Sequence, residues 1–328
     1  AQATWGQRMN PRFRELILGG ELTPVSKTSG AFLAPESNLH LQFAYYQSSL
    51  VVEHLTERFG LEAIRNILKD LGEGVEINAA IAKHTEPLNK LEPAFRAYAV
   101  TKAKALAPEL DWTKPDSETL RAGMEEFAKK HPKNFYLLVR QARRALNDKD
   151  WEAVKAPCKE LIKLFPRQTN GEGNPYVMLA RAQRELEEYQ AERQTLEALA
   201  AMADDAYPIF QRLTELAAEQ KDWEAVRLNC ERVLAVNPLL PATHRHLAMA
   251  AEALNDAPQA IESWQTLLRL DPLDPAEANY RLARLLREPD NPKAKRHLLM
   301  ALEEAPRFRE ALKLLLDWET TEGNPDEK

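Results

Sequence analysis

The stretch DWEAV occurs twice in this chain, at residues 150–154 and again at residues 222–226. Each copy continues through a cysteine eight residues after its aspartate to a proline sixteen residues after it: Cys158 and Pro166, then Cys230 and Pro238. Every matching position is therefore displaced by 72 residues. That displacement is about twice the ~34-residue period of arrays built from helix-turn-helix repeats.

Prolines mark the same period through most of the second half of the chain. An interval of 34 residues separates neighbours in two series: Pro132 and Pro166, then Pro238, Pro272 and Pro306. In the wider gap between the series, the segment EYQAERQTLEALAAMAD keeps the pattern but ends at Asp204 in place of a proline. The sequence therefore predicts an all-α array of about five helix pairs.

This ladder resembles the tetratricopeptide repeat (TPR) over residues 116–318. Each unit has a small residue early in its second helix, where two antiparallel helices must approach closely: Ala153, Ala191, Ala225, Ala260 and Ala294. The first-helix glycine of the TPR consensus is absent, and alanines lie near its place: Ala142, Ala248 and Ala283. The resemblance implies a right-handed α-solenoid of about five repeats whose first helices line a concave groove.

Composition argues against several classes of function. The chain has 328 residues, 44% apolar and 29% charged, which is ordinary for a soluble helical protein of two domains. Its net charge is -6 with both signs interspersed, which predicts neither a nucleic-acid footprint nor a polybasic membrane anchor. No apolar run approaches the ~18 residues of a membrane span. Any signal peptide would lie upstream of Ala1, so the sequence does not assign a compartment. It does not assign an oligomeric state either.

The two cysteines, Cys158 and Cys230, occupy equivalent places two repeats apart. Neighbouring helical repeats lie about 10 Å apart, so these thiols are expected beyond the ~7 Å limit on Cα separation for a disulfide. Free cysteine is among the residue types most often buried. We therefore expect both to be small core residues.

The N-terminal third has a different organisation. Residues 1–37 are rich in glycine, proline, serine and threonine, which predicts loops with one short helix at residues 11–18. From residue 39, apolar residues recur at helical spacing until Gly60, which should end the helix: Phe43, Tyr46, Leu50, Val51, His54 and Leu55. The predicted parts are a loop-rich segment, a helical subdomain of four helices, the repeat solenoid and a disordered tail: residues 1–37, 38–107, 116–318 and 319–328.

The run AYYQSSLVVEHLTERFG in this subdomain, with the helices that follow, resembles the C-terminal helical subdomain of gluzincin (peptidase MA-like) zinc metallopeptidases. The family spacing places a tyrosine three residues before a small residue and fifteen before a glycine, which here are Tyr45, Ser48 and Gly60. The resemblance implies that Tyr45 donates a hydrogen bond to the oxyanion formed during peptide hydrolysis, because a phenol is a neutral, directed donor. The alternative is a helix-start residue with its ring in the core and its hydroxyl at the surface.

The chain lacks the metal-binding half of such an enzyme. Zinc would require the HExxH motif, and no two of the seven histidines are four residues apart. We therefore expect no catalysis and no cofactor in this chain as given. We expect bound zinc only in a longer natural protein that carries the HExxH motif upstream of Ala1. This chain would then be the C-terminal part of a zinc peptidase.

The predicted first helices of the repeats have a marked charge bias. They hold ten arginines and no lysine, against six acids. Arginine binds carboxylates with two parallel hydrogen bonds, so we predict a groove for a protein or peptide partner, with acidic segments favoured, at three positions: Arg143, Arg181 and Arg245. The alternative is a solvated face with internal ion pairs. The leading hypothesis is accordingly a non-catalytic protein-interaction module, and the zinc peptidase fragment is its competitor.

Overall fold

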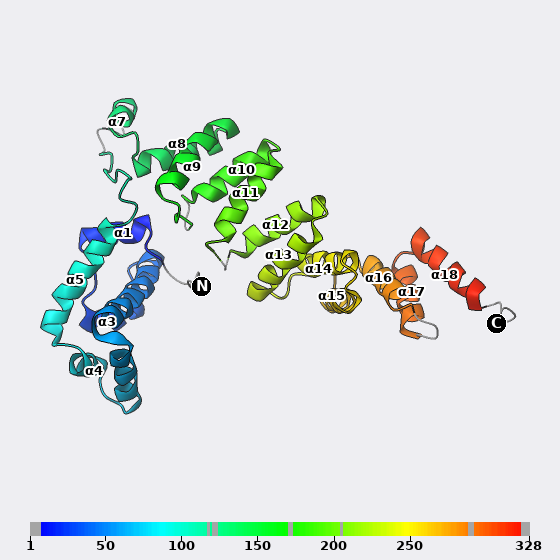
Figure 1. Cartoon of the computed structure of the whole chain (residues 1–328), viewed down its shortest axis with the longest axis horizontal. Helices are drawn as coiled ribbons and strands as arrows, with labels where there is room; N and C mark the ends of the chain where they lie inside the picture. Colours follow the sequence, from blue (N-terminus) through cyan, green and yellow to red (C-terminus); the bar gives the residue numbers. More distant parts are fainter. Residues whose placement is uncertain are drawn as a thin grey trace. The chain divides into compact units, whose positions relative to one another are not determined.

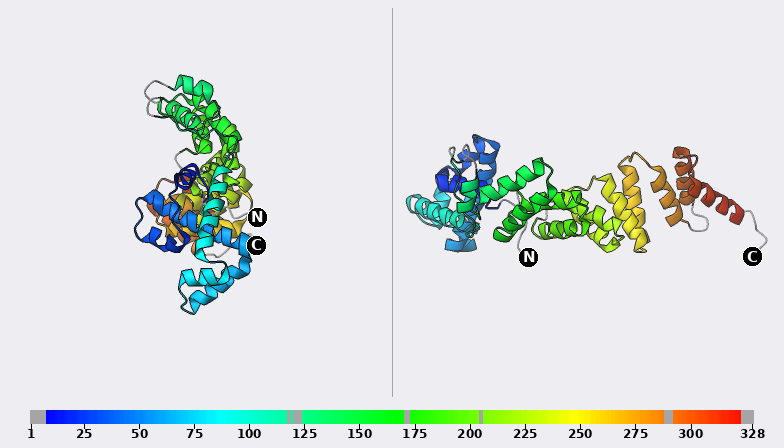
Figure 2. Two further views of the ribbon diagram at one scale, coloured as in Figure 1. Left: turned by 90° about the vertical axis from the view of Figure 1, so that its left-hand side faces the viewer. Right: turned by 90° about the horizontal axis from the view of Figure 1, so that it is seen from above.

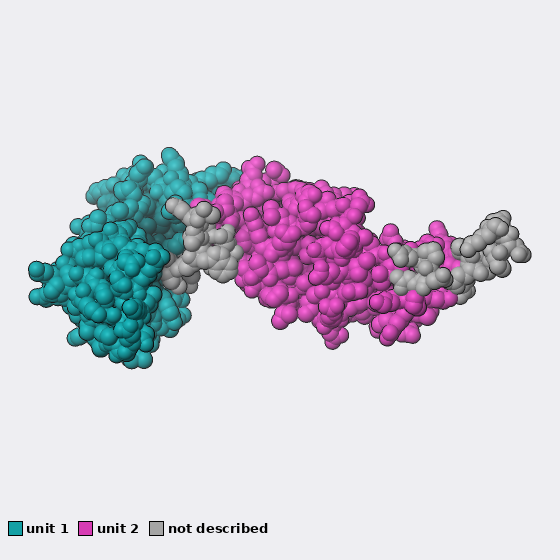
Figure 3. All heavy atoms as spheres, turned by 60° about the horizontal axis from the view of Figure 1, so that its bottom comes forward, with its two compact units in different colours: residues 1–182 teal, residues 183–328 magenta. Residues whose placement is uncertain are grey.

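The computed structural model of the chain describes residues 8–116, 119, 124–169, 173–203, 206–287 and 292–322, with side chains up to residue 318 in the last helix. Within these ranges the regular elements are helices, and the β-type pairing is a single isolated bridge between Asp111 and Asn134. The expected all-α fold is confirmed. The chain divides into two compact units, residues 1–182 and residues 183–328, and each is described by itself (Figure 3).

Unit 1 begins with helices that share one core (Figure 1). Their bounds are α1 Pro11–Gly19, η1 Val25–Lys27, α2 Thr28–Leu33, α3 Asn38–Gly72, α4 Ile77–His84 and α5 Leu88–Lys104. The short helix expected at residues 11–18 is thus confirmed as α1. Its Phe13 is 1% exposed and stacks on Tyr46 of α3, with ring centroids 5.0 Å apart. The segment expected to be loop-rich therefore packs into the core of the helical subdomain.

Gly60 interrupts α3 where the sequence predicted a helix end. Its φ of 79° and ψ of 166° lie in a region open essentially to glycine alone. Helical geometry resumes beyond it, so α3 is two helical segments joined at a kink. The apolar stripe predicted before the kink is buried throughout: Phe43, Tyr46, Leu50, Val51, His54 and Leu55.

The linker joins the first repeat through a set of hydrogen bonds around Asp111. The carboxylate accepts from the Thr113 backbone N–H at 2.8 Å and contacts the His131 ring. The Asp111 carbonyl accepts from Phe135 N at 2.9 Å, and Asn134 Nδ2 donates to the Thr113 carbonyl at 2.8 Å. Burial alone would raise the pKa of Asp111, but hydrogen bonds to its carboxylate from Thr113, His131 and Asn134 outweigh it and lower the pKa to about 2.

The rest of unit 1 belongs to the repeat ladder, and the predicted boundary at residues 107–116 lies inside this unit. Its helices are α7 Glu125–Lys130, α8 Phe135–Asn147, α9 Trp151–Leu164 and α10 Pro175–Glu185, which crosses the division between the units. The N-terminal helices contact this part directly. Tyr136 of α8 donates a 2.6 Å hydrogen bond to Glu15, and the Arg14 guanidinium lies 4.4 Å from the centre of the Trp112 ring.

Unit 2 consists of successive helix pairs (Figure 2). Its helices are α11 Tyr189–Ala200, α12 Tyr207–Glu219, α13 Trp223–Val236, α14 Pro241–Ala253, α15 Ala257–Arg269, α16 Ala276–Leu285, α17 Pro292–Glu304 and α18 Arg309–Glu322. Each packs on the next in the chain, and α12 also contacts α14, which is the helix-pair arrangement of a TPR array. Residues 319–322, which the sequence analysis expected in the disordered tail, are helical. Asp204, which takes the place of a ladder proline, lies outside the described residues.

The DWEAV stretch explains why the second helices begin where they do. Asp150 and Asp222 are N-caps whose carboxylates accept from the N–H of Ala153 and Ala225, at 3.2 and 3.3 Å. The residue before each aspartate is a lysine with φ of 56°, a left-handed conformation that reverses the chain. Cys158 and Cys230 follow in these helices and are 0% exposed, so their expected place in the core is confirmed.

An ion pair with a fully buried member lies at the start of unit 2. Glu192 of α11 is 2% exposed and accepts from Nε and Nη2 of Arg212 on α12, at 2.8 and 2.9 Å. Glu215 accepts from the same guanidinium at 2.9 Å. Two parallel bonds from a guanidinium to one carboxylate form a strong, directional pair, so α11 and α12 are held in one alignment.

We predict that Gly60→Ala lowers the free energy of unfolding by about 1–3 kcal/mol, because alanine is strained at this φ and ψ. Gly72→Ala is the matched control: it lies in the same helix, has open space around its Cα, and has no positive φ. Urea unfolding monitored by circular dichroism measures both. Equal midpoints for the two variants would contradict the prediction.

A pH-dependent effect is expected at Asp111. Its folded pKa of about 2 lies below the ~3.9 of an unfolded chain, so its stabilisation is present above pH ~4 and is lost as pH falls toward 2. The stability difference between wild type and Asp111→Asn should therefore shrink between pH 5 and pH 2. Glu109→Gln, at an exposed carboxylate nearby, should stay within about 0.5 kcal/mol of wild type. A difference for Asp111→Asn that does not change with pH would refute the assignment.

Candidate functional site

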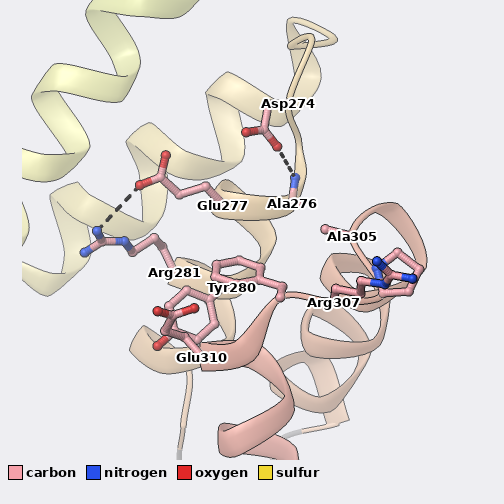
Figure 4. A pocket seen from close by; sticks show the side chains of 10 residues that line it. Asp274, Ala276, Glu277, Tyr280, Arg281, Ala305, Arg307 and Glu310 are labelled. Carbon is pink, nitrogen blue, oxygen red and sulfur yellow. Dashed lines mark hydrogen bonds and ion pairs between the residues drawn. The ribbon is translucent and has the colours of Figure 1, made fainter.

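A hollow of about 810 Å³ lies between α16 and the start of α18, and we call it the α16/α18 hollow (Figure 4). Its lining comes from the first two turns of α16 and the residue two before it, from the turn between α17 and α18, and from the first turn of α18: Asp274, Ala276, Glu277, Tyr280, Arg281, Ala305, Pro306, Arg307, Phe308 and Glu310. Both α16 and α18 are first helices of their repeats. The hollow therefore lies on the first-helix face of unit 2, the kind of surface that the sequence analysis assigned to partner binding.

Local hydrogen bonds set the walls of the hollow. Asp274 Oδ1 accepts from the Ala276 N–H at 3.2 Å where α16 begins, and Phe308 N donates to the Ala305 carbonyl at 3.0 Å where the chain turns into α18. The rings of Tyr280 and Phe308 meet at 4.9 Å between centroids. Both are half-buried, so they give the hollow an aromatic surface that a ligand side chain can contact.

Two reciprocal ion pairs join α14 to α16 beside the hollow. Arg245 donates to Glu277 at 2.9 Å, and Arg281 donates to Glu252 at 3.3 Å. Arg281 also lies 3.5 Å from Glu277, and Glu252 accepts from the indole N–H of Trp264 at 2.8 Å. Because each arginine is already bonded to a carboxylate of this chain, these two cations are partly neutralised before any partner arrives.

The exposed charges at the rim of the hollow differ from this network. Within the described residues, Arg307 and Glu310 are exposed and have no ion partner. The Nε atom of Arg281 is buried and has no hydrogen-bond partner in the same part of the chain. An incoming ligand therefore meets one exposed cation, Arg307, and two exposed carboxylates, Asp274 and Glu310, with the two aromatic rings between the helices.

The three predicted partner-binding arginines do not form one cluster that the structure can describe. Arg143 and Arg181 are exposed residues of unit 1, and the Arg181 guanidinium lies 5.6 Å from the centre of the Trp151 ring. Arg245 belongs to unit 2, is 33% exposed and is paired with Glu277. The alternative of internal ion pairs thus describes Arg245, and an acidic partner for the three residues stays a prediction.

Tyr45 lies on the surface rather than in the core. It is 57% exposed, and its ring meets Phe32 edge-on at 4.9 Å, while the neighbouring Tyr46 is 6% exposed. Because α3 begins at Asn38, Tyr45 lies well inside the helix, so the alternative of a helix-start residue with its ring in the core is wrong for Tyr45. Across the described residues, no three His, Cys, Asp or Glu side chains are grouped to hold a metal ion. The catalytic role of Tyr45 stays a prediction.

The thiols and the helix lengths add two further findings. Burial raises the pKa of Cys158 and of Cys230 to about 12, so neither forms the reactive thiolate near neutral pH. No helix in the described ranges is both long enough and apolar enough to cross a membrane.

No protein-family model matches the chain, and no curated protein matches it in sequence. Solved structures do resemble it. YrrB, described as a TPR protein with an unusual peptide-binding site, is 13% identical with a TM-score of 0.47, over 58% of this chain and 97% of its own. TTC0263, a thermophilic TPR protein of Thermus thermophilus, is 20% identical with a TM-score of 0.32, over 55% and 98%. MamA is 12% identical with a TM-score of 0.41, over 59% and 96%. These likenesses concern the fold alone.

The sequence analysis did not identify the aromatic and rim residues of the hollow. The second helix α17 lies between Tyr280 and the adjacent residues Arg307 and Phe308. No local sequence pattern therefore joins the three residues. One signal was available, because Arg307 and Phe308 directly follow Pro306 of the ladder. In a helix-pair array, that place in the repeat lies beside the preceding first helix.

Removing the shared carboxylate should weaken the fold. Glu277→Ala takes away the partner of Arg245 and one partner of Arg281, so we expect the free energy of unfolding to fall by about 1–2 kcal/mol. Glu310→Ala, in the same hollow but exposed and unpaired within the described residues, should change it by less than about 0.5 kcal/mol. Thermal or urea unfolding separates the two, and equal effects would argue against the network.

Proposed function

We propose that the chain is a protein-interaction scaffold whose unit 2 binds an extended peptide segment of a partner protein in the α16/α18 hollow. The observation that carries the proposal is the hollow itself, about 810 Å³ in volume, on the first-helix face. Its volume suits one or two ligand side chains, since small-molecule sites fall between about 300 and 1,000 Å³. The helix-pair array supplies the support of the hollow, because α16 packs on α15 and α17, and α17 packs on α18.

The lining suggests the chemistry of the bound segment. Tyr280 and Phe308 offer half-buried aromatic surface, which favours an apolar or aromatic side chain of the partner. Arg307 offers an exposed guanidinium beside it, which favours a carboxylate. The proposed partner segment therefore carries an acidic residue next to an apolar one. The acidic contact that we propose is accordingly at Arg307 rather than at Arg245, whose guanidinium is paired with Glu277.

As a second candidate, we propose that this chain is the C-terminal part of a longer zinc peptidase. It is supported by the exposed phenol of Tyr45 and by the interruption of α3 at Gly60, the position that the family spacing specifies. The natural protein, purified whole, would be assayed for zinc by elemental analysis and for peptide hydrolysis. Tyr45→Phe should then reduce kcat while zinc content stays unchanged. A natural protein that holds no zinc and hydrolyses no peptide would contradict this proposal.

Peptide binding can be tested without knowing the partner. A random peptide library displayed on phage would be selected on the immobilised chain, and the enriched peptides measured by fluorescence anisotropy. Tyr280→Ala and Arg307→Glu should each weaken binding about tenfold or more, since each removes a contact of about 1.4 kcal/mol. Binding should also weaken as salt rises, because exposed charges are screened beyond ~8 Å at physiological ionic strength.

Arg269→Glu is the matched control for charge, because Arg269 is an exposed arginine at the end of α15 and does not line the hollow. It should leave the affinity of the selected peptides unchanged. Selection that enriches no peptide, or peptides that bind all three variants as they bind wild type, would show that the hollow is not the binding site.

A further inference from the structure

The turns that follow the ladder prolines of unit 2 carry an exposed side chain at one repeated position. The turns join α13 to α14, α15 to α16 and α17 to α18, and the residue directly after the proline is Leu239, Leu273 and Arg307 in that order. Successive members are 34 residues apart, which is one repeat. Leu239 is 70% exposed and Leu273 is fully exposed, and no other large apolar side chain described in unit 2 is as exposed as either. We call these three residues the turn row.

Hydrogen bonds fix the two turns that carry the leucines. The Leu239 N–H donates to Asn237 Oδ1 at 3.1 Å. Directly after Leu273, the Asp274 carboxylate accepts from the Ala276 N–H at 3.2 Å, where α16 begins. The exposed leucines are therefore held on ordered backbone. A partner that covers them does not first have to order a loop, which is one of the main costs of binding.

The turn row is continuous with the α16/α18 hollow. Arg307 lines the hollow, and so does Asp274, the residue directly after Leu273 (Figure 4). Leu239 lies one repeat further along the array, just before α14. That helix is joined to the hollow by the ion pair between Arg245 and Glu277. A segment bound in the hollow can therefore continue over the two leucines without leaving the surface of the array.

The spacing of the row selects one backbone conformation of the partner. Packed helices lie about 8–10 Å apart, so we expect about 10 Å between successive members of the row. A β-strand covers this distance in about three residues, but its side chains alternate, so every third residue faces away. A polyproline II helix rises about 9 Å per turn of three residues, so every third side chain lies on one side. The polyproline II period therefore matches the repeat period of the array.

We propose that the partner segment of the hollow is a polyproline II helix that continues along the turn row. Its carboxylate binds Arg307, and apolar side chains at the third and sixth residues from that carboxylate cover Leu273 and Leu239. The aromatic rings of the hollow fit this partner, because polyproline II segments dock in aromatic-lined grooves. The inference rests on the proposed function, and it adds the conformation and the residue spacing of the ligand.

The first test uses peptides selected on the immobilised full chain and measured by fluorescence anisotropy. Leu273→Ser and Leu239→Ser should each weaken binding about fivefold, the effect of leaving part of one apolar contact in water. Leu228→Ser, at a leucine of α13 that is 50% exposed and outside the turns, should bind as wild type does. A peptide shortened to exclude the sixth residue should become insensitive to Leu239→Ser and stay sensitive to Leu273→Ser.

The second test changes the peptide and leaves the protein as it is. Proline at the residues between the three contact positions should preserve or increase affinity, because proline fixes the backbone dihedral that polyproline II requires. Glycine at the same residues should weaken binding, because glycine loses more backbone freedom when it is ordered. Affinity that falls with proline and survives with glycine would overturn the assigned conformation.

The protein variants separate this inference from the proposed function. If Tyr280→Ala and Arg307→Glu weaken binding but the leucine variants do not, the turn row is not part of the site and this inference is overturned alone. Peptides indifferent to all four variants would overturn both. Leucine variants that instead abolish self-association of the chain, or its binding to phosphatidylcholine vesicles, would assign the row to a second copy or to a lipid surface, and would also overturn the inference.

Discussion

Close approach of the two helices in each repeat is the contact on which the rest of this structure depends. Ala142, Ala248 and Ala283 are fully buried at that contact, and side chains of this size let the second helix lie directly on the first. An isolated helix of 13 or 14 residues, the length of α8 or α9, is marginal in water, so neither helix persists without its neighbour. The hollow exists because this contact fixes where each next first helix begins.

Much of this could be predicted because the signals are local. An aspartate that caps a helix, an alanine three residues later and a buried cysteine recur at fixed spacing, and each acts within one repeat. Gly60 could be placed in the same way, since its backbone conformation is a property of the residue itself. The apolar stripe before it also shows why Tyr46 is buried and Tyr45 is not: consecutive residues of a helix point about 100° apart.

The hollow and its charges depended on contacts that a linear pattern does not contain. Arg245 and Glu277 are separated by a whole repeat, and so are Glu252 and Arg281. Counting arginines in the first helices pointed to the face on which the hollow lies, but could not show which of them already held a carboxylate. A repeat period places equivalent residues one above another, and the pairing between them is set by side-chain reach across adjacent helices.

The buried pair of Glu192 and Arg212 has a further consequence for the start of unit 2. Helices that meet only through alanines and leucines can slide by a turn at modest cost, since one apolar side chain replaces another. Sliding α11 against α12 would instead leave the buried Glu192 carboxylate without its guanidinium partner, and breaking a buried pair costs about 3–5 kcal/mol. The pair therefore fixes the register of α11 against α12, and the repeats that follow are built onto helices held in that register.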